Sequence, residues 1–282
     1  MRIVMLTTLV LILAGYLAVG TFLGYRAYRG PAAYSTKDFL VHGRHRSTRT
    51  LVVDAGDSLT QGTFSADYVG LLRRHLNSTG FEFVNAGVNG EKLAGLLKRT
   101  REILSCRPDA ITILIGTNDV HAYLDSQTQH SPVSLSDSIA RFRRDLESLI
   151  PALRSVSTPR IAVFSIPPIG QDMLSHANRA VEQYNETIRQ VCEQNEVTYL
   201  PLNEQARARI VGLADGYRSS AGPSRDLSRN VAIRRFFLWQ TWDQISEKNG
   251  FAIHTDAIHL NSRGARLIAD LEERWLTKGL QP

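Results

Sequence analysis

Hydrophobic residues follow two patterns along the chain, and the change between them lies near residue 50. After that point, short apolar runs alternate with segments that carry apolar residues at helical spacing. The runs predict strands at 51–56, 81–84, 110–115, 160–166 and 198–200. The segments predict helices at 68–76, 93–104, 136–149, 177–193 and 264–276. This alternation predicts an α/β domain at 50–282, in which helices cover both faces of a parallel sheet and functional sites lie at the carboxyl ends of the strands.

The first 25 residues have a different pattern, because the stretch from Ile3 to Tyr25 is apolar and contains no charged residue. About 20 such residues are enough to span a bilayer as a helix. A cleavable signal peptide is the competing interpretation, with the small residues at 18–20 as its cleavage site. Its apolar core would usually be only ~7–15 residues long. We therefore predict an uncleaved, single-pass transmembrane anchor at 1–25.

A basic segment at 26–49 follows the anchor and lacks hydrophobic periodicity, so we predict a juxtamembrane tether. Its cationic residues are Arg26, Arg29, Lys37, Arg44, Arg46 and Arg49. Next to a membrane span, such a cluster indicates anionic lipid headgroups rather than nucleic acid. Counted literally, these charges would keep the domain in the cytoplasm. A long C-terminal domain often translocates regardless of local charge, however, and we expect the domain on the extracytoplasmic side.

Composition adds few constraints to this picture. A chain of 282 residues with 43% hydrophobic and 21% charged residues is typical of a folded protein with one sizeable domain. Cys106 and Cys192 are expected to be unpaired thiols in or near the core. His42 and His45 lie in the tether and are not expected to bind metal. Since the chain contains neither an H-E-x-x-H nor a Walker A motif, we expect no cofactor. The oligomeric state is left open.

Polar motifs follow three of the predicted strands. The sequence Gly-Asp-Ser-Leu at 56–59 places Ser58 at the start of a helix, where backbone amides face a developing negative charge. A structural N-cap is the alternative role for Ser58. Gly90 and Asn118 can donate hydrogen bonds to the same oxyanion, although each could simply be a turn residue. Gly87 is an alternative donor to Gly90. Because parallel strands end at one edge, we expect these motifs to meet there.

An acid and a histidine lie three residues apart just before the last predicted helix, in Asp-Ala-Ile-His at 256–259. In a tight turn, the Asp256 carboxylate can accept a hydrogen bond from Nδ1–H of His259. That bond fixes the tautomer and leaves Nε2 free to take a proton from a serine hydroxyl. His254 is the competing base, but no acid lies three residues before it.

These motifs, in this order and at these places relative to the strands, resemble the SGNH hydrolases, also called GDSL esterases and lipases. The resemblance covers the chain from about residue 51 to 275. It implies a flavodoxin-like three-layer α/β/α sandwich with a five-stranded parallel sheet. It also implies that Ser58 is the nucleophile, that His259 is the base and that Asp256 orients it. The oxyanion hole would consist of the Ser58 N–H, Gly90 and Asn118.

Two positions depart from the family pattern, since Glu91 follows Gly90 and Leu260 follows His259, but neither departure removes a catalytic group. The absence of a G-x-S-x-G elbow disfavours the α/β-hydrolase fold. We expect a serine esterase that acts through an acyl-serine intermediate on lipid, short-acyl or acetylated envelope esters. An acyltransferase with the same residues and a non-catalytic envelope-binding module are the alternatives.

The segment between the last predicted strand and Asp256 is longer than a simple crossover requires, so 204–250 is a candidate cap insertion. Within it, the stretch from Val231 to Ile245 contains two phenylalanines and two tryptophans. One interpretation is a helix whose apolar face packs on the sheet. The other is a cap over the active site that supplies an acyl pocket or contacts lipid, which Arg234 and Arg235 would favour.

Overall fold

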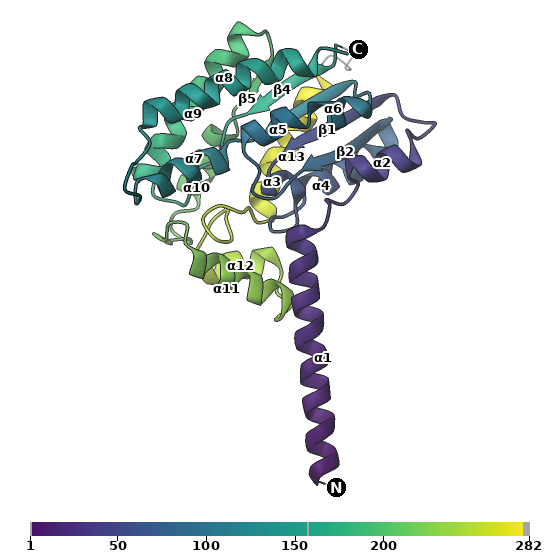
Figure 1. The fold of residues 1–282 in the computed structure, drawn as a ribbon, viewed down its shortest axis with the longest axis vertical. Helices are drawn as coiled ribbons and strands as arrows, with labels where there is room; N and C mark the ends of the chain where they lie inside the picture. The colour runs from purple at the N-terminus through teal and green to yellow at the C-terminus, as the bar shows by residue number, and fades with distance from the viewer. Residues whose placement is uncertain (1, 157, 279–282) are drawn as a thin grey trace.

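A parallel sheet forms the centre of the protein in a computed structural model that describes residues 2–156 and 158–278 (Figure 1). Its strands are β1 (Thr50–Gly56), β2 (Phe81–Gly87), β3 (Ala110–Leu114), β4 (Arg160–Phe164) and β5 (Thr198–Leu200). They are arranged in the order β2-β1-β3-β4-β5, and every neighbouring pair is parallel. This is the flavodoxin-like order, in which ligands bind beyond the carboxyl ends of the strands, at the point where the strand order reverses. The predicted fold class is confirmed.

Helices cover both faces of the sheet and connect its strands (Figure 1). They are α1 (Arg2–Arg29), α2 (Thr36–His42), α3 (Ser58–Gln61), α4 (Tyr68–Leu76), α5 (Leu93–Lys98), α6 (Thr100–Ser105), α7 (Thr117–Ser126), α8 (Leu135–Leu153), α9 (His176–Gln194), α10 (Leu202–Gly212), α11 (Arg225–Phe236), α12 (Trp242–Asn249) and α13 (Ser262–Thr277), with a 3-10 turn η1 (Asn77–Thr79).

Two hydrophobic cores result, one on each face, because successive residues of a strand point to opposite faces. In β1, Val53 points to the core beneath α5, α6, α8 and α9, whereas Val52 points to the core beneath α4, α10 and α13. Both residues are fully buried, as expected for a sheet covered on both sides. Cys106 and Cys192 are buried, unpaired thiols, as predicted.

A polar cluster lies within the second core, between the sheet and α13. The hydroxyl of Thr112 on β3 lies 2.7 Å from Oδ1 of Asp54 on β1 and 3.4 Å from Oε2 of Glu272 on α13. All three residues are fully buried. Burial raises the pKa of both carboxyls, that of Asp54 to about 6 although its hydrogen bond with Glu272 acts in the opposite direction, and the charge of Asp54 raises the pKa of Glu272 further. The two carboxyls therefore retain a proton under conditions in which exposed carboxyls are ionised.

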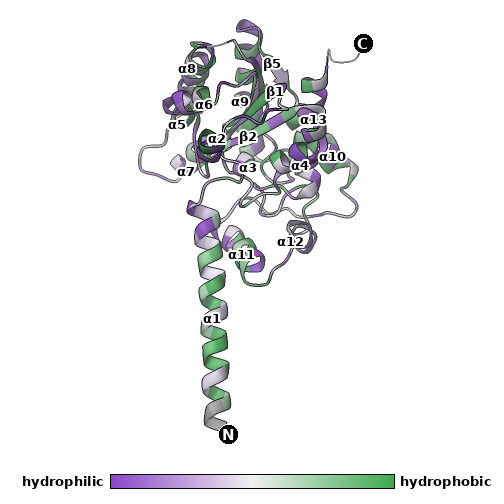
Figure 2. Ribbon diagram, turned by 90° about the vertical axis from the view of Figure 1, so that its right-hand side faces the viewer, coloured by the Kyte–Doolittle hydropathy of each residue, from purple (hydrophilic) through white to green (hydrophobic). Residues whose placement is uncertain are grey.

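Helix α1 extends away from the domain, and its N-terminal part lies beside none of the labelled helices and strands (Figure 1). Its stretch Met5–Arg29 is long and apolar enough to cross a membrane, and its side chains are almost all exposed. Apolar residues make up much of the helix, as Figure 2 shows, and they are not confined to one of its sides. A helix that is hydrophobic on all sides and not covered by protein is typical of a membrane span.

The structure differs from the sequence prediction in three segments. The predicted helix 93–104 is divided at Arg99 into α5 and α6. The tether contains α2, whose Thr36 hydroxyl hydrogen-bonds Glu102 on α6. The stretch 231–245 is not one helix on the sheet: it is broken between α11 and α12, and α11 packs beside α1 (Figure 1). The reason is that the apolar side chains at 236–237 find partners on α1 instead of on the sheet.

Candidate active site

Ser58 lies where β1 turns into α3. A side chain at Gly56 would place a Cβ atom 2.2 Å from Oγ1 of Thr60 and 2.3 Å from the carbonyl oxygen of Leu114, so only glycine fits the close approach of this turn. Asp57, not Ser58, is the N-cap of α3, since its Oδ1 accepts a hydrogen bond of 2.9 Å from the Leu59 N–H. The Ser58 side chain therefore has no capping role and faces the pocket, with 8% of the residue exposed.

A chain of hydrogen bonds connects Ser58, His259 and Asp256. Oγ of Ser58 lies 3.1 Å from Nε2 of His259, and Nδ1 of that ring lies 2.9 Å from Oδ2 of Asp256. The turn 256–259 is held by the same carboxylate, because its Oδ1 accepts the backbone N–H groups of Ile258 and His259 at 3.2 and 2.8 Å. Ala257 adopts a left-handed conformation with φ of 73° to close this turn. The structure thus brings Ser58 together with the Asp256–His259 pair, which lies about 200 positions further along the chain.

The electrostatics of the pair are those of an ionised acid next to a basic imidazole. Burial opposes ionisation of Asp256, but the charge of His259 and hydrogen bonds from His259 and Ser228 hold its pKa below the usual range. Burial would also lower the pKa of His259, but the charge and hydrogen bond of Asp256, together with the charge of Asp57, raise it above the ordinary value. The neighbouring acid thus strengthens the ring as a proton acceptor.

His254, the competing base, lies in a different environment. Its Nε2 is 2.9 Å from the carbonyl oxygen of Pro168, and its Nδ1 has no hydrogen-bond partner among the described residues. Burial lowers its pKa to about 4, so the ring is neutral at physiological pH. It is fully buried and does not line the pocket that contains Ser58. The structure therefore gives His254 a packing position and brings His259 to the serine.

Three hydrogen-bond donors line one side of the pocket. The backbone N–H groups of Ser58 and Gly90 have no acceptor among the described residues, and Gly90 is surrounded by open space. Nδ2 of Asn118 lies 3.0 Å from the carbonyl oxygen of Glu91 and 3.3 Å from Oδ2 of Asp57. The longer of these contacts is the one that a stronger, charged acceptor could replace.

Gly87, the alternative donor, is excluded by its contacts. Its N–H donates to Oδ1 of Asn85 at 2.9 Å. A Cβ atom at Gly87 would lie 2.2 Å from the backbone nitrogen of Gln61, so this glycine permits β2 to pack closely against α3. Gly90 is thus the glycine in this loop that has a free N–H in the pocket.

Asp57 is a further titratable group beneath the site. Burial raises the pKa of its carboxyl to about 7, although the Leu59 N–H and the charge of His259 act in the opposite direction. It is fully buried and contacts Asn118 through Oδ2. Its charge therefore changes near neutral pH, next to the amide that lines the pocket.

The candidate catalytic pocket, which contains Ser58 and His259, has a volume of about 290 Å³ and includes residues that the sequence did not single out. Ser228 of α11 donates a hydrogen bond of 2.9 Å to Oδ2 of Asp256. The ring of Phe64 lies 6.1 Å from that of His259, and Tyr28 at the end of α1 closes another side. No motif marks these three residues, because each reaches the pocket through tertiary contacts of its helix or loop.

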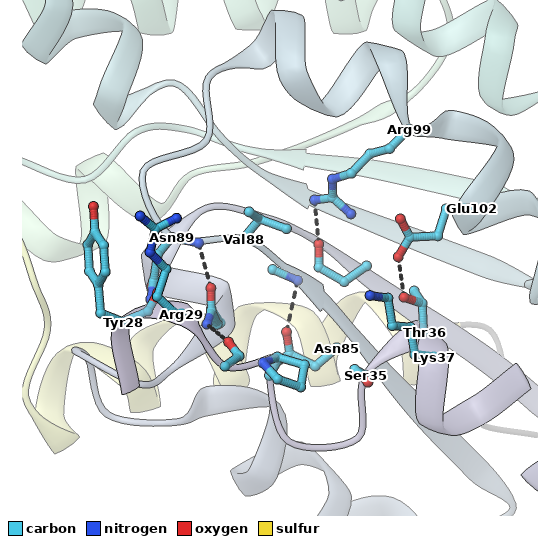
Figure 3. A pocket seen from close by; sticks show the side chains of 16 residues that line it. Tyr28, Arg29, Ser35, Thr36, Lys37, Asn85, Val88, Asn89, Arg99 and Glu102 are labelled. Atoms are coloured by element: carbon cyan, nitrogen blue, oxygen red, sulfur yellow. Dashed lines mark hydrogen bonds between the residues drawn. The ribbon is translucent and has the colours of Figure 1, made fainter. Parts of the chain in front are cut away.

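A second cavity of about 420 Å³ adjoins the catalytic pocket and shares Tyr28 and Asn89 with it (Figure 3). Arg29 lies at one side of this cavity, near Asn89, and Lys37 lies at the other side, near Glu102 (Figure 3). The cavity is thus polar and provides space beside the reacting groups. The structure shows no cluster of metal-ligating side chains among the residues it describes.

The flavodoxin-like sheet with a Ser–His–Asp chain at its carboxyl edge defines an α/β/α protein with the geometry of a serine hydrolase. The model of the GDSL-like lipase/acylhydrolase family matches residues 55–267. The chain belongs to this family, and the resemblance to SGNH hydrolases is confirmed. No curated protein matches the sequence.

Solved structures share the fold at low sequence identity. An acetyl xylan esterase, AlAXEase, is 19% identical with a TM-score of 0.60, and the match covers 80% of this chain and 99% of that one. A lipase/acylhydrolase from Enterococcus faecalis is 18% identical with a TM-score of 0.55, covering 81% and 96%. A catalytic mutant of Axe2, an acetylxylan esterase from Geobacillus stearothermophilus, is 18% identical with a TM-score of 0.57, covering 80% and 94%.

Proposed function

We propose that the protein is a serine esterase in which Ser58 attacks the carbonyl carbon of a carboxylic ester. The observation that carries this proposal is the continuous hydrogen-bonded chain from Ser58 Oγ through His259 to Asp256. Nε2 of His259 takes the hydroxyl proton as the serine attacks and returns it to the leaving alcohol, which leaves an acyl-serine. Water then attacks the acyl group with the same histidine as base, releases the acid and restores the serine.

The negative charge of the tetrahedral intermediate would be held by the N–H groups of Ser58 and Gly90 and by the amide of Asn118. The two backbone donors support this role because they have no other acceptor among the described residues. The contact of the Asn118 amide with Asp57 is long, at 3.3 Å, so an oxyanion in the pocket can draw the amide away from it. The two backbone donors are fixed before the reaction and need no reorganisation.

Similar proteins support these assignments. Axe2 structures described as catalytic mutants replace a serine, an aspartate and a histidine, and the last two are three positions apart. Asp256 and His259 have the same separation. The acetylxylan and lipase/acylhydrolase neighbours keep short acyl, acetylated-sugar and lipid esters as candidate substrates.

We also propose that α1 remains attached as a membrane anchor. The domain holds its end, since the side-chain amide of Asn89 donates to the carbonyl oxygens of Ala27 and Tyr28 at 3.0 and 3.2 Å, and Gln61 donates to that of Gly30 at 2.8 Å. The packing of Phe237 on the backbone at Gly20 supports an uncleaved segment, because a cut at 18–20 would disrupt that contact. We place the domain on the extracytoplasmic side, which protease accessibility in intact cells can test.

Labelling with a fluorophosphonate tests the hydrolase directly. The full chain in detergent should be labelled and should hydrolyse short esters, whereas Ser58→Ala should do neither and keep its far-UV circular dichroism. Normal labelling of Ser58→Ala would place the nucleophile elsewhere. Product analysis with an added alcohol distinguishes hydrolysis from acyl transfer, because a transferase would release a new ester instead of the free acid.

A further inference from the structure

Helix α11 packs against the part of α1 that is suited to lie inside a membrane. The ring of Phe237 lies directly on the backbone at Gly20, where an added Cβ atom would be 2.5 Å from Cδ1 of the ring. Four residues later, Gly24 faces Phe236, with 3.7 Å from the corresponding Cβ position to Cδ2 of that ring. Residues four apart lie on the same face of a helix, so the two glycines form one shallow surface that receives both aromatic rings.

The depth of this contact follows from the sequence of α1. The first charged residue after the apolar stretch is Arg26, and Gly20 precedes it by six residues. At ~1.5 Å per residue, the contact with Phe237 lies about 9 Å inside the charged end of the span. Interfacial helices bury their apolar face by about 5–10 Å. If α1 crosses a bilayer, the end of α11 cannot remain in water.

The turn after α11 exposes further apolar side chains at the same level. Leu238 and Trp239 are 57% and 58% exposed. Trp239 has a φ of 54°, in the left-handed region where glycine would be unstrained and a bulky aromatic residue is costly. The turn is closed by hydrogen bonds from the N–H groups of Leu238 and Gln240 to the carbonyl oxygens of Ile233 and Arg234. The chain thus holds a large aromatic side chain outward at a position where its conformation is unfavourable.

Charge on α11 completes the pattern of an interfacial element. The helix carries four arginines and one acidic residue, namely Arg225, Arg229, Arg234, Arg235 and Asp226. An excess of arginine beside exposed tryptophan and leucine matches a surface that contacts headgroups with one part and acyl chains with another. These residues suit contact with lipid better than contact with a protein partner, because their packing on α1 places them at the depth of the bilayer surface.

The same elements form walls of the catalytic pocket. Tyr28 belongs to α1, Ser228 belongs to α11, and Phe64 lies between them. The ring of Phe64 lies 6.3 Å from that of Tyr28, 5.7 Å from that of Phe236 and 6.1 Å from that of His259. Aromatic contacts therefore lead without interruption from the membrane-level residues to the catalytic histidine.

We propose that α11 and the turn at 237–241 form a second membrane attachment in the leaflet nearest the domain, and that the catalytic pocket takes its ester from a lipid in that leaflet. The inference rests on the proposed anchor and the proposed esterase. The pocket walls then face the bilayer surface, where the acyl-ester groups of lipids lie. A lipid ester needs to move only a short distance to reach Ser58, whereas a soluble ester enters from the aqueous side.

Depth-dependent quenching tests the position of the turn. The full chain with Trp242→Phe and Trp275→Phe retains Trp239 as its one tryptophan, and labelling of Ser58 by fluorophosphonate verifies its fold. In vesicles of phosphatidylcholine with some phosphatidylglycerol, acyl-chain-brominated lipid should quench Trp239, and aqueous iodide should not. Quenching by iodide alone, with the chain still bound to vesicles, would overturn the inference but leave the anchor. Shielding from both quenchers would place a second protein copy over the turn and would also overturn it.

A pair of substrates tests the source of the ester. The double variant Leu238→Asp/Trp239→Asp should lower hydrolysis of lysophosphatidylcholine in vesicles by about tenfold or more, since two apolar side chains that would enter the bilayer become charged. Its hydrolysis of 4-nitrophenyl acetate should match that of the unchanged protein. The matched control is Val156→Asp. Val156 is an apolar residue that is 74% exposed, and it lies between α8 and β4, at the amino ends of the strands and away from the pocket.

Each outcome of this assay has a separate meaning. Unchanged turnover of the vesicle ester in the double variant, or equal loss on both esters, would overturn the membrane inference. If the unchanged protein hydrolysed neither ester, the proposed esterase itself would fail. If it hydrolysed 4-nitrophenyl acetate but not the vesicle ester, the esterase would stand and the lipid substrate would be wrong.

Discussion

Asp256 and the pair Asp54–Glu272 are buried to the same extent, yet their pKa values shift in opposite directions. Asp256 lies at the carboxyl edge of the sheet, where His259 and Ser228 contact it. Asp54 and Glu272 lie inside the core, with the Thr112 hydroxyl and each other as neighbours. Oδ2 of Asp54 and Oε1 of Glu272 have no hydrogen-bond partner among the described residues.

The difference shows that burial alone does not determine the charge of a carboxyl group. Desolvation disfavours the ionised form at both places, and only at Asp256 do a cationic partner and several N–H and O–H donors outweigh it. The first environment holds a carboxylate that can support a charged imidazole during catalysis. The second environment, around Asp54 and Glu272, retains a proton and links β1, β3 and α13 by hydrogen bonds.

Removal of the histidine should break the first environment completely. His259→Ala should lower kcat by roughly 10⁴ or more, and the double variant with Ser58→Ala should be little worse, since residues that act as one unit are strongly non-additive. Steady-state hydrolysis of a soluble ester measures this. His254→Ala is the control and should retain most activity. A dead His254→Ala with an active His259→Ala would require that the base be reassigned.

Neutralising the acid should weaken the site less than, or as much as, removing the base. Asp256→Asn should cost up to about 10⁴ in kcat, because the histidine remains but loses its tautomer and its charged partner. In the unchanged protein, activity should rise with pH as His259 loses its proton, at a pKa above the ordinary value for histidine. In Asp256→Asn that pKa should fall. An unchanged midpoint of kcat/KM against pH would contradict the assigned coupling.

Loss of an oxyanion donor should have the next largest effect. Asn118→Ala should lower kcat by roughly 10²–10³, while KM changes little, because the charge develops only in the transition state. A change in KM alone would mean that Asn118 positions the substrate instead.

The core pair should affect stability and leave catalysis intact. The folded protein retains a proton on Asp54 up to a pKa of about 6, whereas the unfolded chain loses it near 4. Protons are therefore bound more tightly in the folded state, and the free energy of unfolding should fall as pH rises from about 4 to 6. Asp54→Asn should reduce this slope by up to about 1.4 kcal/mol per pH unit. Urea unfolding across this range measures the slope, and an unaltered slope would contradict the raised pKa.

The sheet and the residues of the candidate site were accessible to sequence analysis because each leaves a local pattern. Strand β3 is a continuous apolar run, and Asp256 precedes His259 by the separation that one turn requires. The path of α11 leaves no such pattern, since the partner of Phe237 is a glycine some 200 residues away on α1. The same holds for Ser228, which reaches Asp256 only after α11 has packed.

The contact between Asn89 and the end of α1 connects the proposed membrane anchor to the loop that carries Gly90. Asn89 holds the last carbonyl groups of the helix, and the residue that follows it is Gly90. A helix adjusts to a bilayer that is too thin or too thick by tilting, at a cost of a fraction of a kcal/mol per Å. If α1 is the proposed anchor, a tilt would be transmitted to the loop that carries Gly90. By linkage, a ligand that orders this loop would resist the tilt, so the affinity for that ligand would depend on the thickness of the membrane.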